Sequence, residues 1–164
     1  THKSLADEQG GFRRNRGTAD LIFMLREIVM TRKLRGQCTL ATFIDARKAY
    51  DTVWREGNFV RLHDMGIRGK LWRQLQAMAA NPKSKIRLPF GETEYFRVSR
   101  GVAQGAVESP FLYACFINGL AEELKNKGMG IIIAGKRTPL LMYADDVVFL
   151  AGDVKELREK PSGD

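Results

Sequence analysis

The 164-residue chain is poor in the residues that build crosslinked or metal-dependent small folds. It has two cysteines, Cys38 and Cys115, and two histidines. The cysteines lie far apart inside apolar stretches, and they match neither a zinc-binding spacing nor a disulfide framework. We therefore expect two buried, reduced thiols, as is usual for free cysteine in a reducing compartment.

Long hydrophobic runs are also missing. No apolar stretch approaches the roughly 18–20 residues that a membrane-spanning helix needs, and no secretory signal pattern opens the chain. We therefore expect no membrane partner. The 16 glycines and 5 prolines follow no period, which excludes a collagen-like chain.

Acidic residues are fewer than basic ones. The chain has 19 Asp and Glu but 27 Lys and Arg, so its formal net charge is +8. A basic surplus of this size favours a polyanionic partner, most simply nucleic acid. An ordinary solvated surface would give the same composition. A hydrophobic fraction of 44% and a charged fraction of 28% are typical of one globular domain of this length.

Hydrophobic periodicity predicts a mixture of helices and short strands. A helix is expected from Thr18 to near Gly36, and one from Ser109-Pro110 to Lys127 with the serine hydroxyl as its N-cap. The remaining elements are a buried strand over 38–45, helices over 47–66 and 70–80, a β-hairpin over 84–99, short strands over 130–153, and a helical start to the tail. This order predicts an α+β fold in which a small antiparallel sheet has helices packed on one face.

An acidic doublet, Asp145-Asp146, lies between LLM and VVFL, the least polar pieces of the chain. The plain interpretation is a hairpin turn, which favours aspartate. Asn-Gly or Asp-Gly would serve a tight turn better, and neither occurs here. Adjacent acids repel, and near a core they are costly without a cation beside them. The doublet therefore also suggests a metal site.

Asp45 ends the apolar segment CTLATFID, where the strand would leave the core and meet a cleft. A cap for the following helix is the alternative. If the strand over 38–45 pairs next to the hairpin over 140–151, Asp45 and Asp145 face one another. Carboxylates at strand ends are hard oxygen ligands that suit Mg²⁺ or Mn²⁺. Two such ions activate an attacking hydroxyl and stabilise a leaving phosphate.

A glycine-rich loop, GVAQGAVES, precedes the helix that starts at Ser109. Gly101 and Gly105 would allow the backbone to approach a ligand closely. Gln104 could donate and accept hydrogen bonds there, and the helix start adds a positive dipole end. Glycine-rich loops before helices are common, so this motif alone is weak.

The segments FIDARKAYDTV, GVAQGAVESPFLYACFINGL and YADDVVFLA resemble motifs A, B and C of reverse transcriptases, in that order. The upstream QGGFRRNRG resembles the Gln-x-Gly-Phe-Arg segment of the enzymes from non-LTR retrotransposons. The resemblance covers residues 8–152. It implies a polymerase-type palm and an RNA-directed DNA polymerase that transfers nucleotides from dNTPs to a primer 3′-hydroxyl on an RNA template with two Mg²⁺ or Mn²⁺ ions.

The resemblance also implies roles for individual residues. Asp45 and Asp145 would be the main metal ligands, and Asp146 a less strictly ligating neighbour. Tyr50 would be the steric gate under the incoming sugar, although it could equally be a core aromatic. Ile44 and Ala46 would offer backbone contacts to metal or triphosphate, and Gln104 and Gly105 would bind the nucleotide. Arg13 and Arg16 would bind nucleic acid. A solvated loop explains these two arginines equally well.

The family's fingers strands, primer grip and thumb have no counterpart in this sequence. We therefore expect one partial domain, with a fingers-proximal segment over 1–37, a palm over 38–152 and a tail over 153–164. Its partners would be an RNA template, a DNA primer, dNTPs and the missing regions of a parent polypeptide. The isolated chain would be inactive and could self-associate. An intracellular, nuclear location is expected for such an enzyme.

Two other functions remain open. The chain could be a non-catalytic nucleic-acid-binding or scaffold module that keeps the palm fold. It could also be an unrelated metal-dependent nuclease, but His2 and His63 lie outside the motifs, so it lacks the histidine bases that often activate water.

Overall fold

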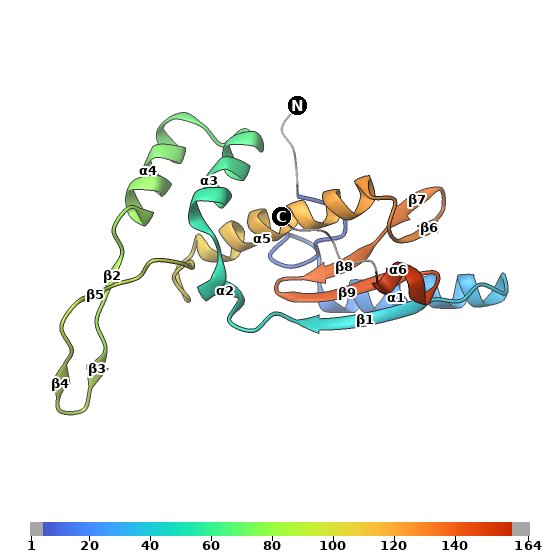
Figure 1. The fold of residues 1–164 in the computed structure, drawn as a ribbon, viewed down its shortest axis with the longest axis horizontal. Helices are drawn as coiled ribbons and strands as arrows, with labels where there is room; N and C mark the ends of the chain where they lie inside the picture. Colours follow the sequence, from blue (N-terminus) through green and yellow to red (C-terminus); the bar gives the residue numbers. More distant parts are fainter. Residues whose placement is uncertain (1–4, 159–164) are drawn as a thin grey trace. The chain divides into compact units, whose positions relative to one another are not determined.

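The computed structural model describes residues 5–158, which divide into two compact units. We call residues 5–47 and 117–158 the sheet unit and residues 48–116 the helical unit. The sheet unit contains α1 (Thr18–Leu34), β1 (Leu40–Asp45), β6 (Ile131–Ile133), β7 (Lys136–Thr138), β8 (Leu140–Tyr143), β9 (Asp146–Ala151) and α6 (Val154–Arg158) (Figure 1). The long helix α5 (Ser109–Asn126) begins in the helical unit and ends in the sheet unit. Among the described residues, no helix has the length and apolar character needed to span a bilayer.

The centre of the sheet unit is a three-stranded antiparallel sheet in the order β1-β9-β8 (Figure 1). The β8–β9 hairpin pairs Tyr143 with Asp146, and β1 pairs with β9 from Leu40 opposite Ala151 to Asp45 opposite Asp146. The predicted pairing of the strand over 38–45 with the hairpin is therefore confirmed. The short pair β6–β7 forms a separate antiparallel hairpin.

Both faces of the β8–β9 hairpin are covered. Neighbouring residues of a strand point to opposite faces, so each strand contributes to two cores. Leu141 and Val148 pack on one face with Ile28 of α1. Leu140 and Met142 pack on the other face with Leu124 of α5. The predicted α+β character fits this arrangement, but the expectation of helices on one face is wrong. The reason is visible in LLM and VVFL, whose unbroken apolar runs supply apolar side chains to both faces.

The first strand differs from its prediction. β1 is an edge strand whose residues are mostly exposed, and Phe43 has 74% of its surface accessible. The expected buried strand over 38–45 is therefore shorter, and it is buried on neither face. Cys38 lies just before it and is exposed, so the prediction of two buried thiols holds only for Cys115. Burial raises the pKa of the Cys115 thiol to about 12.

Helix α1 has the predicted limits, which are set by capping interactions at its two ends. The backbone N–H of Gly17 donates to the Asp20 carboxylate at 2.7 Å, which caps the first turn. At the other end Gly36 adopts a positive φ of 66°, which suits glycine at the end of a helix.

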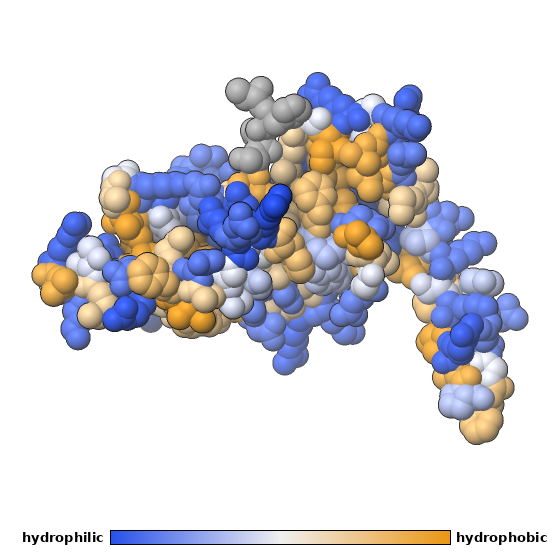
Figure 2. Space-filling model, turned by 180° about the vertical axis from the view of Figure 1, so that it is seen from behind, coloured by the Kyte–Doolittle hydropathy of each residue, from blue (hydrophilic) through white to orange (hydrophobic). Residues whose placement is uncertain are grey.

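The helical unit contains α2 (Ala49–Thr52), α3 (Arg55–Asp64), α4 (Gly69–Ala79) and the first part of α5. The helix expected over 47–66 is broken at Val53 and Trp54, which both have extended backbone ψ angles. The expected hairpin over 84–99 is present as two short pairs, β2 (Lys83–Ser84) with β5 (Phe96–Arg97) and β3 (Arg87–Leu88) with β4 (Gly91–Glu92). It projects as an arm whose surface includes apolar side chains (Figure 2). Phe90 and Tyr95 are exposed.

Helix α5 starts at the predicted Ser109-Pro110, but the serine has another role than the expected N-cap. Its hydroxyl donates to the carbonyl of Ala103 at 2.6 Å, and so it closes the preceding loop onto the helix. Pro110 occupies the first turn, where its missing N–H costs no hydrogen bond.

Burial of both sheet faces predicts that two adjacent leucines are equally important for stability. Leu140→Ala and Leu141→Ala should each lower the free energy of unfolding by about 2–5 kcal/mol, because each removes a buried side chain from a different face. Phe43→Ala should change it by less than about 0.5 kcal/mol, since Phe43 is exposed. Urea denaturation monitored by circular dichroism measures all three. A large loss in the free energy of unfolding for only one of the two leucine variants would contradict a core on both faces.

Candidate active site

The acidic doublet lies at the tip of the β8–β9 hairpin. Because Tyr143 pairs with Asp146, Ala144 and Asp145 form a two-residue loop. Ala144 has a positive φ of 58°, the conformation required at the first position of a type II′ turn. The interpretation of the doublet as part of a tight turn is therefore confirmed, although neither loop residue is glycine.

The sheet brings Asp45 to the same place. Asp45 and Asp146 are direct partners across β1 and β9, so their side chains leave the same face of the sheet. Both line one open cavity of about 480 Å³ beside Tyr143. The register therefore corrects the prediction that Asp45 faces Asp145, because the residue opposite Asp45 is Asp146. Asp145 lies one residue earlier, in the loop. Three carboxylates therefore lie at one end of the sheet.

These carboxylates are accessible to solvent. Asp45 and Asp146 are exposed and Asp145 is half-exposed. The argument that the core would make the doublet costly without a cation is therefore wrong. Within residues 5–158, none of the three forms an ion pair with a lysine, arginine or histidine.

The donor set suits a hard divalent cation. Mg²⁺ keeps several waters and commonly binds through one or two carboxylates together with substrate phosphates. Asp45 and Asp146 supply such a pair of carboxylates on adjacent strands. In the described part of the chain, no three His, Cys, Asp or Glu side chains are gathered into a ready-made metal cage.

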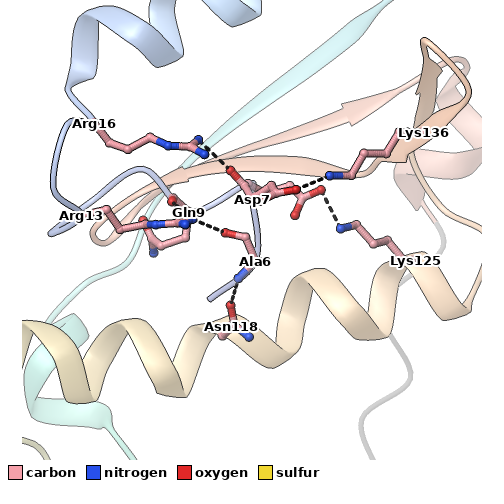
Figure 3. Close-up of polar contacts among 9 residues, drawn as sticks. Ala6, Asp7, Gln9, Arg13, Arg16, Asn118, Lys125 and Lys136 are labelled. Atoms are coloured by element: carbon pink, nitrogen blue, oxygen red, sulfur yellow. Dashed lines mark hydrogen bonds and ion pairs between the residues drawn. The ribbon is translucent and has the colours of Figure 1, made fainter. Parts of the chain in front are cut away.

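Residues 6–9, before α1, run beside β8. Hydrogen bonds and ion pairs hold this segment in place (Figure 3). Asn118 of α5 accepts a hydrogen bond from the Ala6 N–H at 2.6 Å. The buried Glu8 forms an ion pair with Lys125 at 2.6 Å, and Asp7 forms one with Lys136. The sequence prediction did not single out these residues, because an ion pair between distant segments leaves no periodic signal.

Arg13 and Arg16 serve this same segment. An Nη1 atom of Arg13 donates to the carbonyls of Ala6 and Gln9, and one of Arg16 donates to the carbonyl of Asp7 (Figure 3). Each guanidinium therefore stabilises its own loop. Their nucleic-acid contacts stay a prediction.

Tyr50 lies in the helical unit, on α2. Its ring stacks on that of Tyr113 with the centroids 5.1 Å apart and the planes 18° apart. Tyr50 is half-buried and Tyr113 is buried. This geometry fits a packed aromatic, and the sugar-gating role stays a prediction.

The glycine-rich loop is also in the helical unit, and its two glycines differ. A Cβ on Gly101 would lie 2.7 Å from the Asp51 Cα atom and 2.7 Å from the Tyr50 carbonyl oxygen. Gly101 therefore allows the loop to pack on α2, whereas the sequence predicts that both Gly101 and Gly105 approach a ligand. Gly105 and Gln104 are exposed, and Gly105 has open space around it.

Arg55 holds the start of this loop. Its guanidinium donates to the carbonyls of Val98, Arg100 and Gly101 at 2.9, 2.8 and 2.5 Å. An arginine at the start of a helix gives no sequence signal for such a role. Gln104 and Arg55 both line a cavity of about 350 Å³ in this unit.

Comparison with known proteins identifies the family of this arrangement. The family model for reverse transcriptase (RNA-dependent DNA polymerase) matches residues 1–161. The chain belongs to the reverse transcriptase family. The predicted resemblance to reverse transcriptases of non-LTR retrotransposons is thereby confirmed, and with it membership of a nucleotidyltransferase enzyme family.

The similar curated proteins come from mobile elements. The chain is 28% identical over 144 residues to the retrovirus-related Pol polyprotein from type-1 retrotransposable element R2 of Popillia japonica, covering 87% of the chain and 20% of that protein. It is 24% identical over 146 residues to the probable RNA-directed DNA polymerase from transposon BS of Drosophila melanogaster, covering 89% of the chain and 16% of that protein. The chain thus spans about a fifth or less of the length of these two relatives.

The ion pair that anchors the first segment predicts a pH dependence. Hydrogen bonding and attraction to Lys136 lower the pKa of Asp7, and the same contact raises the pKa of Lys136. The stability that Asp7 adds is therefore present above the pKa of an unfolded aspartate, about 3.9, and is lost as the pH falls through the lowered value. The contribution of Lys136 is present below about 10.4 and is lost as the pH rises through the raised value.

Lys136→Met tests this assignment. The pKa of Asp7, followed by the NMR shift of its carboxyl carbon, should rise toward the value of a free aspartate. Lys127→Met is the control, because Lys127 pairs with Glu123. An Asp7 pKa that stays unchanged in Lys136→Met would rule out the ion pair in solution.

Proposed function

We propose that this chain is the metal-binding palm of an RNA-directed DNA polymerase. The observation that carries the proposal is the alignment of Asp45 opposite Asp146, with Asp145 beside it in the turn. In a chain of net charge +8, these carboxylates form no ion pair with any basic residue among those described. Carboxylates left free in a basic chain are suited to a cation from solution.

Asp45 and Asp145 would hold two Mg²⁺ or Mn²⁺ ions, with Asp146 as an additional ligand and Ile44 offering its backbone. Bound there, the ions supply Lewis acidity toward a primer hydroxyl and charge neutralisation for the leaving pyrophosphate. The protein's share is to place the carboxylates. The strand pairing supports this, because it fixes Asp45 and Asp146 on one face of the sheet.

The incoming dNTP would be held by the remaining predicted residues. Ala46 follows Asp45 directly and would offer its backbone N–H to the triphosphate. Gln104 and Gly105 are exposed in the helical unit, and Gly105 has open space beside it, which suits a nucleotide contact. Tyr50 would pack under the sugar. The basic surplus would bind the phosphates of an RNA template and a DNA primer, with affinity that falls as salt rises.

The metal site predicts the effect of removing each carboxylate. Asp45→Asn and Asp145→Asn should each weaken Mn²⁺ binding by about tenfold or more, since each removes a charged ligand. Asp51→Asn is the matched control, because Asp51 is an exposed aspartate in the helical unit. Electron paramagnetic resonance of free Mn²⁺ in a titration of the chain measures all three.

The same titration separates the proposal from the scaffold alternative. A scaffold would bind RNA in a salt-dependent manner and show the same weak Mn²⁺ binding in every variant. Equal Mn²⁺ affinity in wild type, Asp45→Asn and Asp145→Asn would therefore contradict the catalytic proposal.

Nucleotidyl transfer itself is tested in a polypeptide that supplies fingers and thumb around this chain. With Mg²⁺, an RNA template and a DNA primer, primer extension should fall to background in Asp45→Asn and Asp145→Asn. Circular dichroism should show that both variants remain folded, because both carboxylates are accessible and form no ion pair within residues 5–158. Extension at the wild-type rate in either variant would remove that aspartate from the mechanism.

A further inference from the structure

A buried glutamine lies against the loop that carries Asp145. Gln9 has 0% of its surface exposed, although it belongs to a polar segment. Its Oε1 accepts hydrogen bonds from the N–H of Gly11 at 2.8 Å and from the N–H of Ala144 at 3.2 Å. Its Nε2 donates to the carbonyl of Ala144 at 3.4 Å. One side chain therefore contacts both backbone polar groups of the first loop residue.

The backbone around Gln9 follows β8 up to this loop. Gln9 and Met142 form an isolated parallel bridge. The N–H of Met142 donates to the Glu8 carbonyl at 2.9 Å, and the N–H of Gly10 donates to the Met142 carbonyl at 2.8 Å. The segment is itself held by Asn118, Lys125 and Lys136 (Figure 3). It therefore acts as a support that is anchored independently of the loop.

Gly11 brings this support into direct contact with the turn. A Cβ on Gly11 would lie 2.2 Å from the Ala144 nitrogen and 2.8 Å from its Cα atom, and both are backbone atoms. A Cβ on Gly10 would meet the Leu21 side chain, with its Cδ1 atom at 2.9 Å. The end of a leucine side chain can move, whereas the loop backbone can yield only by displacing the turn.

The turn needs such support, because Ala144 has a φ of 58°. This left-handed conformation is unfavourable for a residue with a Cβ atom. It persists where the surrounding structure holds it. Gln9 and Gly11 are the contacts that hold Ala144 from the side of the first segment.

We propose that Gln9 and Gly11 clamp the Ala144–Asp145 loop and that Gln9 is a positioning residue for the Asp145 and Asp146 carboxylates. The clamp rests on these contacts alone. Its effect on a divalent cation rests on the proposed function. Gln9 acts through the backbone of Ala144 and touches no reacting atom.

The clamp is tested by amide hydrogen exchange, measured by NMR on the 164-residue chain. Gln9→Met keeps the length of the side chain and removes its hydrogen bonds. Exchange at Ala144 and Gly11 should accelerate by roughly tenfold or more, as expected for the loss of a hydrogen bond. Asn118→Ala is the matched control, because it removes a side-chain anchor of the same segment at Ala6. Exchange at Leu150, whose N–H donates to Pro139, reports on the sheet as a whole.

The positioning role is tested by Mn²⁺ affinity, read out by electron paramagnetic resonance. Gly11→Ala should weaken binding by roughly tenfold, and Gly10→Ala should leave it within about twofold. Gln9→Met should weaken it as Gly11→Ala does. If Gly11→Ala fails to fold, seen as lost protection at Leu150, Gln9→Met decides the outcome.

The outcomes separate the clamp from the proposed function. Unchanged exchange at Ala144 in Gln9→Met would overturn the clamp. Accelerated exchange with unchanged Mn²⁺ affinity would overturn the positioning role. If amide exchange at Ala144 accelerates in Gln9→Met while the wild-type chain binds no Mn²⁺, the clamp is supported and the proposed function fails.

Discussion

The antiparallel register between β1 and β9 is the interaction on which the candidate site depends. It places Asp45 opposite Asp146, so that two side chains about 100 residues apart in sequence leave the same face of the sheet. A slip of one residue would turn every β1 side chain to the other face. The register of the middle strand β9 is fixed, because Val147 and Val148 are buried in two cores on opposite faces of the sheet. The position of Asp45 is therefore set by a strand that is buried on both sides.

The sequence was informative where side chains are buried in a regular pattern. The limits of α1, the start of α5 at Ser109 and the hairpin over 140–151 all follow from apolar spacing and turn residues. The same patterns misled where tertiary context decides. CTLATFID resembles a core strand, yet Phe43 is exposed because β1 lies at the sheet edge, and no local pattern distinguishes an edge from a centre.

The carboxylates of the candidate site could be predicted from the sequence, but the residues that hold their loop in place could not. Carboxylates at the end of an apolar strand and inside an apolar hairpin stand out against their neighbours. Gln9 does not, because it lies in a polar, glycine-rich segment and its partner Ala144 is 135 residues away. The two glycines beside Gln9 resemble loop residues, and only the structure shows that Gly11 packs against backbone and Gly10 against a side chain. Roles created by contact between distant segments leave no periodic trace.

The strand pairing at Asp45 and Asp146 conflicts with the stability of the sheet. Like charges directly opposite on adjacent strands are destabilising, and an unfavourable φ at Ala144 adds to the cost. Two other acidic residues of the sheet unit have basic partners, because Asp7 pairs with Lys136 and Glu8 pairs with Lys125. Local conflicts of this kind are characteristic of functional sites. A divalent cation between the carboxylates would reverse the sign of the interaction, so the arrangement that weakens the sheet by itself is the one that favours binding.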